Sequence, residues 1–378
     1  MTSRSLAKPT DITSLDRSIA DAESGAMVVW RGERIAFPAL PERIARIDDR
    51  HERDRLFSAY LEALEALNPR YEDRLQRWAS AGEQLTAGLE VDPVGLAADL
   101  ERFVLHSETP YYAALRRYLA LIDIEQGDAT VADVWHIARG ATWTRWFGAR
   151  EVRRAVAAVG RDLADPGGGE HEGWLAAEDQ LGAGSSGASL PGAAVGAAYR
   201  TLAGSPEWAA QEIGVAAAEV VPYVDFVAFV RLWRIRRAIG ELQYELRLSS
   251  NPDPALARAY YSGIVGHMTG VMVPEAAYLH VLSAPFESAQ RLAVEILAAD
   301  LVEVLEGRYG PTWWRSAEAT GLIGGIGATA SVGDALAQLG YDALDWRPLL
   351  RQIRTRLIGE MSGYGGPNIT TRAGTRKV

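Results

Sequence analysis

Apolar residues recur at intervals of three and four through most of this 378-residue chain, and this spacing limits the possible folds more than any other feature. Leu56, Tyr60, Leu64 and Leu67 are one example. Residues at this spacing share one face of an α-helix, which must be covered by neighbouring elements. Nothing in the chain has the pattern of a parallel sheet, and the segment 26–37 reads as a small hairpin or an extended arm. The spacing therefore predicts an all-α fold.

Prolines, glycines and polar clusters divide the pattern into separate helices. Residues 48–79 have a long amphipathic pattern that is interrupted near Asn68 and Pro69. We expect further helices at 93–106, 110–124, 130–139, 149–163, 191–203, 206–217, 222–248, 253–269, 274–281, 286–308, 312–324, 331–339 and 346–361. Pro110 marks the start of one of them, because the first turn of a helix tolerates proline. Glycine-rich stretches at 165–169 and 182–187 bracket a short helical piece and are typical of flexible joints.

The same breaks predict how the chain is organised. We expect a flexible N-terminus at 1–25, an N-terminal helical lobe at 26–165, a flexible linker at 166–190, a C-terminal helical lobe at 191–362 and a disordered tail at 363–378. The chain is long enough, and at 48% hydrophobic residues apolar enough, to form a large core.

Charge and composition exclude several classes of function. The net charge of −10 and the pI of about 5.3 argue against binding to nucleic-acid phosphates. Cysteine is absent, which excludes disulfides, thiolate metal sites and cysteine nucleophiles. The first fifteen residues lack the apolar core of a signal peptide, and no stretch has the roughly 20 apolar residues of a membrane span. We therefore expect a soluble, cytoplasmic protein.

An incomplete metal-binding pattern lies in the predicted linker. His171 and Glu172 begin the pattern H-E-x-x-H, in which two histidines one helical turn apart bind a single zinc ion. The second histidine position is occupied by Leu175, whose side chain has no donor atom.

Together with five further stretches, this segment resembles the M3 oligopeptidase (oligoendopeptidase F-like) family of zinc peptidases. The stretches lie in the family's order at 131–140, 205–208, 229–248, 286–314 and 339–345. The resemblance covers roughly residues 130–360, with a looser likeness at 26–78. It implies a shortened M3-like scaffold with two helical lobes around a central cleft.

The resemblance also implies that the zinc site is lost. The family's third zinc ligand, a glutamate, falls on Gly192, so two of the three ligand positions carry no donor side chain. Glu172 then has no metal-bound water to deprotonate. We expect no functional zinc peptidase, no metal and no other cofactor. The segment before His171 is shorter than in the family, which would open the cleft to a partner.

A second departure from the family falls on the predicted cleft. Two tyrosines of the family, four residues apart, are replaced here by Glu287 and Arg291. Residues at this spacing share a helix face, so the two side chains can form an ion pair. One interpretation is a plain surface salt bridge. The other is a cleft in which the carboxylate binds an amine and the guanidinium binds an anionic group.

Other polar residues complete the set of candidates. Glu245 is the best candidate for a buried carboxylate, on the apolar helix 222–248, and we assign it a catalytic role with Glu287 and Arg291. Substrate-binding candidates are His136, Tyr244, Tyr260 and His267, although each of them alone also fits a structural or solvent-facing role. A stripe of arginines at 231, 234, 236 and 237 is explained more simply by a solvated face or by pairing with acids than by phosphate binding.

Two classes of function fit these features. In the first, the scaffold has become a metal-independent enzyme acting on a small amine- or amino-acid-derived intermediate of a bacterial biosynthetic pathway, by elimination or cyclisation. In the second, it is a catalytically inactive pseudopeptidase that binds a peptide, or a protein partner that covers the opened cleft. An enclosed polar pocket with a perturbed carboxylate or histidine favours the enzyme, and an open groove favours the binding protein.

Overall fold

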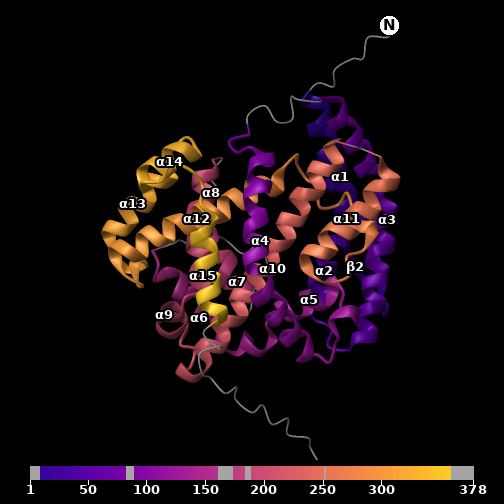
Figure 1. Cartoon of the computed structure of the whole chain (residues 1–378). Coiled ribbons are helices and arrows are strands. Elements are labelled where there is room, and N and C mark those ends of the chain that lie inside the picture. The colour runs from indigo at the N-terminus through magenta and orange to yellow at the C-terminus, as the bar shows by residue number, and fades with distance from the viewer. Residues whose placement is uncertain (1–8, 82–88, 161–172, 184–188, 251–252, 359–378) are drawn as a thin grey trace, which may run out of the picture.

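The computed structural model describes residues 9–81, 89–160, 173–183, 189–250 and 253–358, and the prediction of an all-α fold is confirmed for them (Figure 1). The helices are α1 (Pro9–Gly25), α2 (Leu40–Ala45), α3 (Arg50–Ala81), α4 (Pro93–Ala120), α5 (Val131–Ala138), α6 (Ala149–Ala157), α7 (Trp174–Gly182), α8 (Leu190–Arg200), α9 (Pro206–Trp208), α10 (Ala217–Ser250), α11 (Pro254–Thr269), α12 (Glu287–Tyr309), α13 (Ala317–Gly327), α14 (Val332–Leu339) and α15 (Trp346–Ile358). Among these described elements, no helix is both long and apolar enough to cross a lipid bilayer.

The one sheet among the described residues is a hairpin at the position where the sequence allowed a hairpin or an extended arm. Strands β1 (Met27–Trp30) and β2 (Glu33–Ala36) pair antiparallel, with Met27 opposite Ala36. The two-residue turn between them has positive φ at Arg31 (52°) and Gly32 (83°). Positive φ at both positions gives a turn whose twist matches that of the flanking strands, and glycine accepts it without steric cost.

The N-terminal segment is helical where we expected flexibility. From Pro9 to Gly25 the chain forms α1, which packs against α3. Ile19 of this helix is 3% exposed, and the Tyr71 hydroxyl on α3 donates a hydrogen bond of 2.6 Å to Glu23. The polar composition of the segment hid a narrow apolar stripe that α3 covers. Residues 1–8 lie outside the described part of the chain.

Proline is accommodated inside two long helices. The ranges 93–106 and 110–124 were predicted as two helices, yet they form the single helix α4 with Pro110 in its interior. Pro69 lies inside α3 in the same way. A proline in a helix interior removes one backbone hydrogen bond. In α4 this cost is offset because Phe103 and Tyr111, on either side of the proline, are both fully buried.

The expected linker contains a helix that belongs to the core. The short helical piece predicted between the two glycine-rich joints is α7, and both Trp174 and Leu181 are buried. The Trp174 indole donates a hydrogen bond of 2.9 Å to the carbonyl of Ala138 on α5. Residues 174–182 are therefore anchored and not a flexible linker. The predicted motif residues His171 and Glu172, and the predicted tail 363–378, lie outside the described residues.

Helix α10 runs through the middle of the molecule. It packs against α4, α11, α12 and α15. Figure 1 shows α4 and α10 between α1, α3 and α11 on one side and α12, α13 and α14 on the other. A single cluster of buried apolar side chains continues across both sides, from Ile19 to Leu357. The boundaries given for two lobes stay a prediction.

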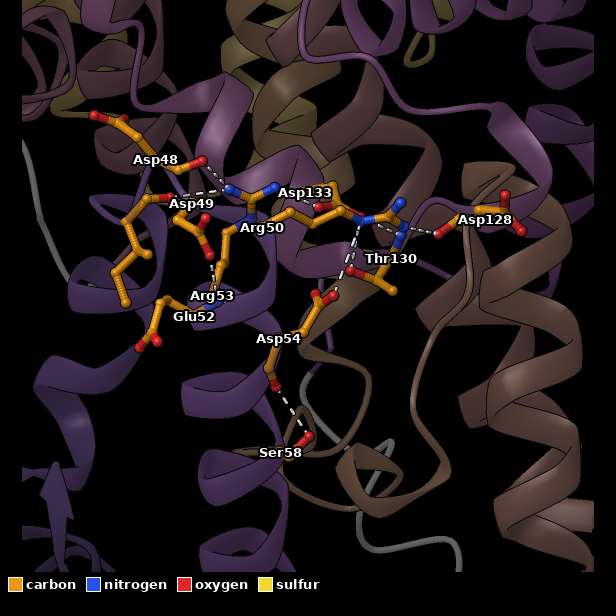
Figure 2. A network of polar contacts seen from close by, with 11 residues as sticks. Asp48, Asp49, Arg50, Glu52, Arg53, Asp54, Ser58, Asp128, Thr130 and Asp133 are labelled. Atoms are coloured by element: carbon orange, nitrogen blue, oxygen red, sulfur yellow. Dashed lines mark hydrogen bonds and ion pairs between the residues drawn. The ribbon is translucent and has the colours of Figure 1, made fainter.

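A buried ion pair joins the N-terminal end of α3 to α5 (Figure 2). Arg53 Nη2 lies 2.8 Å from Asp133 Oδ1, and the two side chains are 2% and 0% exposed. Asp133 also accepts a hydrogen bond from the backbone of Thr130, which caps α5, and Arg53 donates to the carbonyl of Ile47. These bonds compensate two charges that water cannot reach, while the Nε atom of Arg53 has no hydrogen-bond partner among the described residues. They fix α5, which carries Trp135 and Arg139 to the wall of the cleft described below.

Replacing one member of this pair is expected to destabilise the fold strongly. Asp133→Asn leaves the Arg53 charge buried without a counterion, and we expect the free energy of unfolding to fall by about 3–5 kcal/mol. Urea denaturation followed by circular dichroism measures the change. The matched control is Asp54→Asn in the exposed pair with Arg50, where we expect a loss of less than about 1 kcal/mol. Equal losses in the two variants would contradict this assignment.

Candidate functional site

A large cleft lies beside α10, with a volume of about 1390 Å³. Helices α10 and α12 form its long wall, and α2, α5, α7, α8 and α15 surround it. Its charged lining residues are Arg46, Arg139, Arg200, Arg231, Arg234, Arg237, Arg291, Arg356, Glu42, Glu178, Asp179, Glu241, Glu287 and Glu295. Eight arginines thus face six acidic side chains, an excess of two positive charges in a chain whose net charge is −10. A local field of this sign attracts anionic ligands.

At one end of the cleft, two arginines share one buried carboxylate. Glu241 is 4% exposed and lies between Arg237, at 2.9 Å, and Arg291, also at 2.9 Å. Burial is the largest single influence on the pKa of Arg237 and lowers it, but the charge and hydrogen bond of Glu241, together with two nearby tyrosines, raise the pKa on balance, so the guanidinium stays charged. We call Arg237, Glu241, Glu287 and Arg291 the Glu241 corner.

The two predicted residues Glu287 and Arg291 both line the cleft, but they do not pair with each other. Arg291 pairs with Glu241 on α10 instead, and Glu287 accepts a hydrogen bond from Ser283. The expected ion pair within the helix is therefore wrong. The reason is burial: the carboxylate of Glu241 has little access to water and needs the second guanidinium more than the half-exposed Glu287 does.

Glu245 lies behind the wall of the cleft. It is 7% exposed, and its carboxylate accepts a hydrogen bond from the hydroxyl of Ser288. Arg291 Nη2 in turn donates to that hydroxyl at 3.2 Å. Burial, opposed in part by the Ser288 hydrogen bond, raises the pKa of Glu245 to about 7. The sequence correctly indicated a buried carboxylate, but this one influences the cleft only through Ser288 and Arg291.

The predicted histidines lie away from the Glu241 corner. His136 is half-buried on α5, where its Nδ1 donates a hydrogen bond of 2.9 Å to the carbonyl of Ala45, and burial lowers its pKa. His267 is exposed near the end of α11. Neither is among the residues that line the cleft.

The predicted tyrosines are also separate from the cleft lining. Tyr244 is fully buried, and its ring packs edge-on against Tyr261 with centroids 5.2 Å apart. Tyr260 is partly buried, and its hydroxyl accepts a hydrogen bond of 3.2 Å from Arg247. The structure therefore brings together Glu287 and Arg291, with Glu245 behind them, and places the four predicted binding residues elsewhere.

Acids pair with three of the four arginines of the stripe on α10, as one of the two simpler interpretations predicted. Arg231 pairs with Glu295 at 3.1 Å, and Arg234 pairs with Glu178 at 2.7 Å. Arg236 is buried on the opposite face, where it donates to the carbonyl of Met268 and to Ser107.

Sequence reasoning missed Arg200 and Arg356, which line the same cleft from α8 and α15. Arg200 is the last residue of α8 and Arg356 is one of four arginines on α15, so no local pattern distinguished either from a surface arginine. Only the packing of α15 on α10 and of α8 on α12 brings them to the stripe.

The residues at the family's zinc positions do not fit a zinc ion. Leu175 presents an apolar side chain to the cleft. Gly192 lies in the first turn of α8, where its N–H donates to the Ser189 hydroxyl at 3.3 Å. In the part of the chain that the structure describes, no three His, Cys, Asp or Glu side chains are grouped as metal ligands.

Zinc is therefore expected to leave the protein's stability unchanged. A metal that binds only the folded state raises the melting temperature by an amount that grows with the ratio of the free metal concentration to its dissociation constant. We expect the same melting temperature for chelator-treated protein before and after addition of equimolar zinc. Elemental analysis of the purified protein provides an independent check. Stoichiometric zinc in the purified protein, or a melting temperature that rises when zinc is added, would make a zinc peptidase a candidate function again.

The pKa of Glu245 predicts how stability depends on pH. Because the pKa rises from 4.5 to about 7 on folding, the protonated carboxyl stabilises the fold below about pH 4.5, and this contribution is lost as the pH rises through about 7. Glu245→Gln mimics the protonated form. We expect it to match the wild type near pH 5 and to melt at a higher temperature near pH 8. Asp300, whose pKa burial raises to about 8, titrates in both proteins, so their difference isolates Glu245.

Comparison with known proteins gives no match, either to a family model or to a curated protein. The likeness to M3 peptidases therefore rests on the quoted stretches and their order. The function has to be argued from the chemistry of the cleft, because a helical scaffold alone does not determine an activity.

Proposed function

We propose that this chain is a metal-independent protein on an M3-like scaffold whose cleft binds, and acts on, a small amine- or amino-acid-derived molecule. The observation that carries the proposal is the Glu241 corner. Two guanidiniums share one carboxylate there, so a positive charge remains for an anionic group, and the separate carboxylate of Glu287 lies on the same wall. The absence of cysteine suits a reducing cytoplasm, which is the location we propose.

Arg291 is suited to bind the anionic group of such a molecule. Its side chain is 49% exposed, and its hydrogen bonds to Glu241 and Ser288 both come from Nη2. Within the described residues Nη1 and Nε have no hydrogen-bond partner, so the planar fork keeps donors for a carboxylate. Arg237 pairs with Glu241, and Ser288 accepts a hydrogen bond from Arg291, so both side chains hold the corner in place.

Glu287 supplies the complementary charge for an amine. It lies one helical turn before Arg291, and Cβ atoms at that spacing are about 5–6 Å apart. A molecule that carries both an ammonium and a carboxylate can therefore contact both side chains at once. Glu287 can then accept a proton from the bound molecule, while Arg291 fixes its orientation. Elimination and intramolecular cyclisation require this combination of orientation and proton transfer.

The size of the cleft favours a second candidate. Its volume of about 1390 Å³ exceeds the roughly 300–1,000 Å³ of most small-molecule sites. A peptide fills such a space better than a single amino acid. A pseudopeptidase that binds peptides without cleaving them is therefore the alternative, with the Glu241 corner contacting a terminal carboxylate.

Calorimetric titration with free amino acids, their decarboxylated amines and N-acetylated tetrapeptides that keep a free C-terminal carboxylate tests both functions. We expect at least one free amino acid to bind and its amine to bind more weakly. Arg291→Gln should weaken the amino acid by roughly tenfold or more, because a charge-assisted hydrogen bond is lost. Glu287→Gln should reduce the preference for a free amine.

The matched control is Arg308→Gln, an exposed position on the same helix α12, which should leave affinity unchanged. Binding of the N-acetylated tetrapeptides in place of amino acids would support the pseudopeptidase. If Arg291→Gln and Arg308→Gln change the binding affinity equally, the Glu241 corner takes no part in either proposed function.

A further inference from the structure

The opposite end of the cleft collects three arginines around one carboxylate. Arg231 precedes Glu241 by ten residues on α10, which corresponds to about 15 Å of helix. Here Arg200 from α8, Arg231 from α10 and Arg356 from α15 line the cleft together with Glu295 from α12. We call these four residues the arginine end.

One carboxylate compensates the first two guanidiniums only in part. Arg231 donates from Nε and Nη2 to the same oxygen of Glu295, at 3.2 and 3.1 Å. Arg200 approaches the other oxygen at 4.0 Å, the limit for an ion pair. The remaining nitrogen of Arg231, Nη1, is buried and has no partner among the described residues. A buried donor without an acceptor is costly unless a ligand supplies one.

Arg356 adds a third charge without a counterion of its own. In the described part of the chain, its guanidinium has no hydrogen-bond or ion-pair partner, while the carboxylates of Glu306 and Glu207 act on it only from a distance. Burial, and then repulsion by Arg231, lower its pKa to about 10. A Cβ atom at Gly204 would lie 3.1 Å from Nη1, so the missing side chain leaves the room that this guanidinium occupies.

The charge balance of the arginine end indicates what it binds. Three guanidiniums and one carboxylate leave an excess of two positive charges within the cleft lining. A carboxylate ligand would neutralise only one of them. A phosphate monoester carries about −1.5 to −2 charges at pH 7 and has three strong acceptor oxygens. Planar guanidiniums bind these oxygens in pairs.

We propose that the arginine end is a binding subsite for a phosphate-type dianion, either free phosphate or the phosphate of a monoester. The arginine stripe of α10 alone argued against phosphate, because acids compensate it. Arg200 and Arg356 change that balance, because they add two guanidiniums. Glu295 approaches both Arg200 and Arg231, and Arg356 forms no ion pair among the described residues. The subsite does not depend on the molecule bound at the Glu241 corner.

Calorimetric titration of the full chain at constant ionic strength tests the subsite, with inorganic phosphate and glycerol 3-phosphate as probes and chloride as the background anion. We expect both probes to bind the wild type, with the tighter one identifying the source of the phosphate. Arg356→Gln should weaken binding by roughly tenfold or more, since it removes charge-assisted hydrogen bonds. Arg354→Gln, an exposed position two residues away on the same helix, should leave binding unchanged.

Two further variants separate the possible reasons for a loss of phosphate binding in Arg356→Gln. Arg200→Gln tests the same subsite at a residue whose side chain is 35% exposed, so its replacement perturbs the fold least. Arg291→Gln, at the other end of the cleft, should keep its affinity for phosphate even if the proposed amino-acid site fails. Thermal denaturation should show that phosphate raises the melting temperature of the wild type and not that of Arg356→Gln.

The proposal is overturned if the wild type binds neither probe more tightly than chloride. It is also overturned if Arg356→Gln and Arg354→Gln weaken phosphate binding to the same extent, because phosphate would then sense only the overall charge of the protein.

Discussion

The arginines of α10 need compensation inside the protein, from carboxylates or from backbone carbonyls, because this 34-residue helix is covered by other helices along most of its length. A buried guanidinium without compensation costs more than most single contacts contribute. Arg231, Arg234 and Arg237 solve this by pairing with acids on α12, on α7 and on α10 itself. These pairs link the helices around the cleft to the central one, so the same charges that shape the cleft also position its walls.

The two ends of the cleft differ in how completely this compensation is achieved. At the Glu241 corner, one carboxylate serves two arginines, and a second carboxylate, Glu287, stands apart. At the arginine end, one carboxylate lies among three arginines, and Arg356 is the one that forms no ion pair among the described residues. Incomplete compensation raises the free energy of the empty protein, and an anion that enters the cleft lowers it. The guanidiniums that lack a full set of counter-charges are therefore already positioned to bind an anion in the folded protein.

The sequence predicted the helical class and the short helix between the glycine-rich joints, and it left residues 26–37 as either a hairpin or an extended arm, because each depends on local backbone preferences and spacing. It failed where tertiary packing outweighed a local signal. Pro110 read as a helix start, but burial of Phe103 and Tyr111 keeps α4 continuous. The polar N-terminal residues read as flexible, but α3 covers the single buried face of α1.

By itself, the sequence determined that this chain forms helices, that Leu175 and Gly192 cannot bind a metal, and that Glu287 and Arg291 share one helix face, because these follow from side-chain chemistry and helical spacing. Only the tertiary structure decided that Arg291 pairs with Glu241, that Glu245 lies behind the cleft wall, and that Arg200 and Arg356 meet the stripe of α10. The physical reason is that ion pairing and burial depend on which distant helices pack together. The local spacing of the sequence places a charged side chain on one face of a helix, and the packing of distant helices decides which side chains that face contacts.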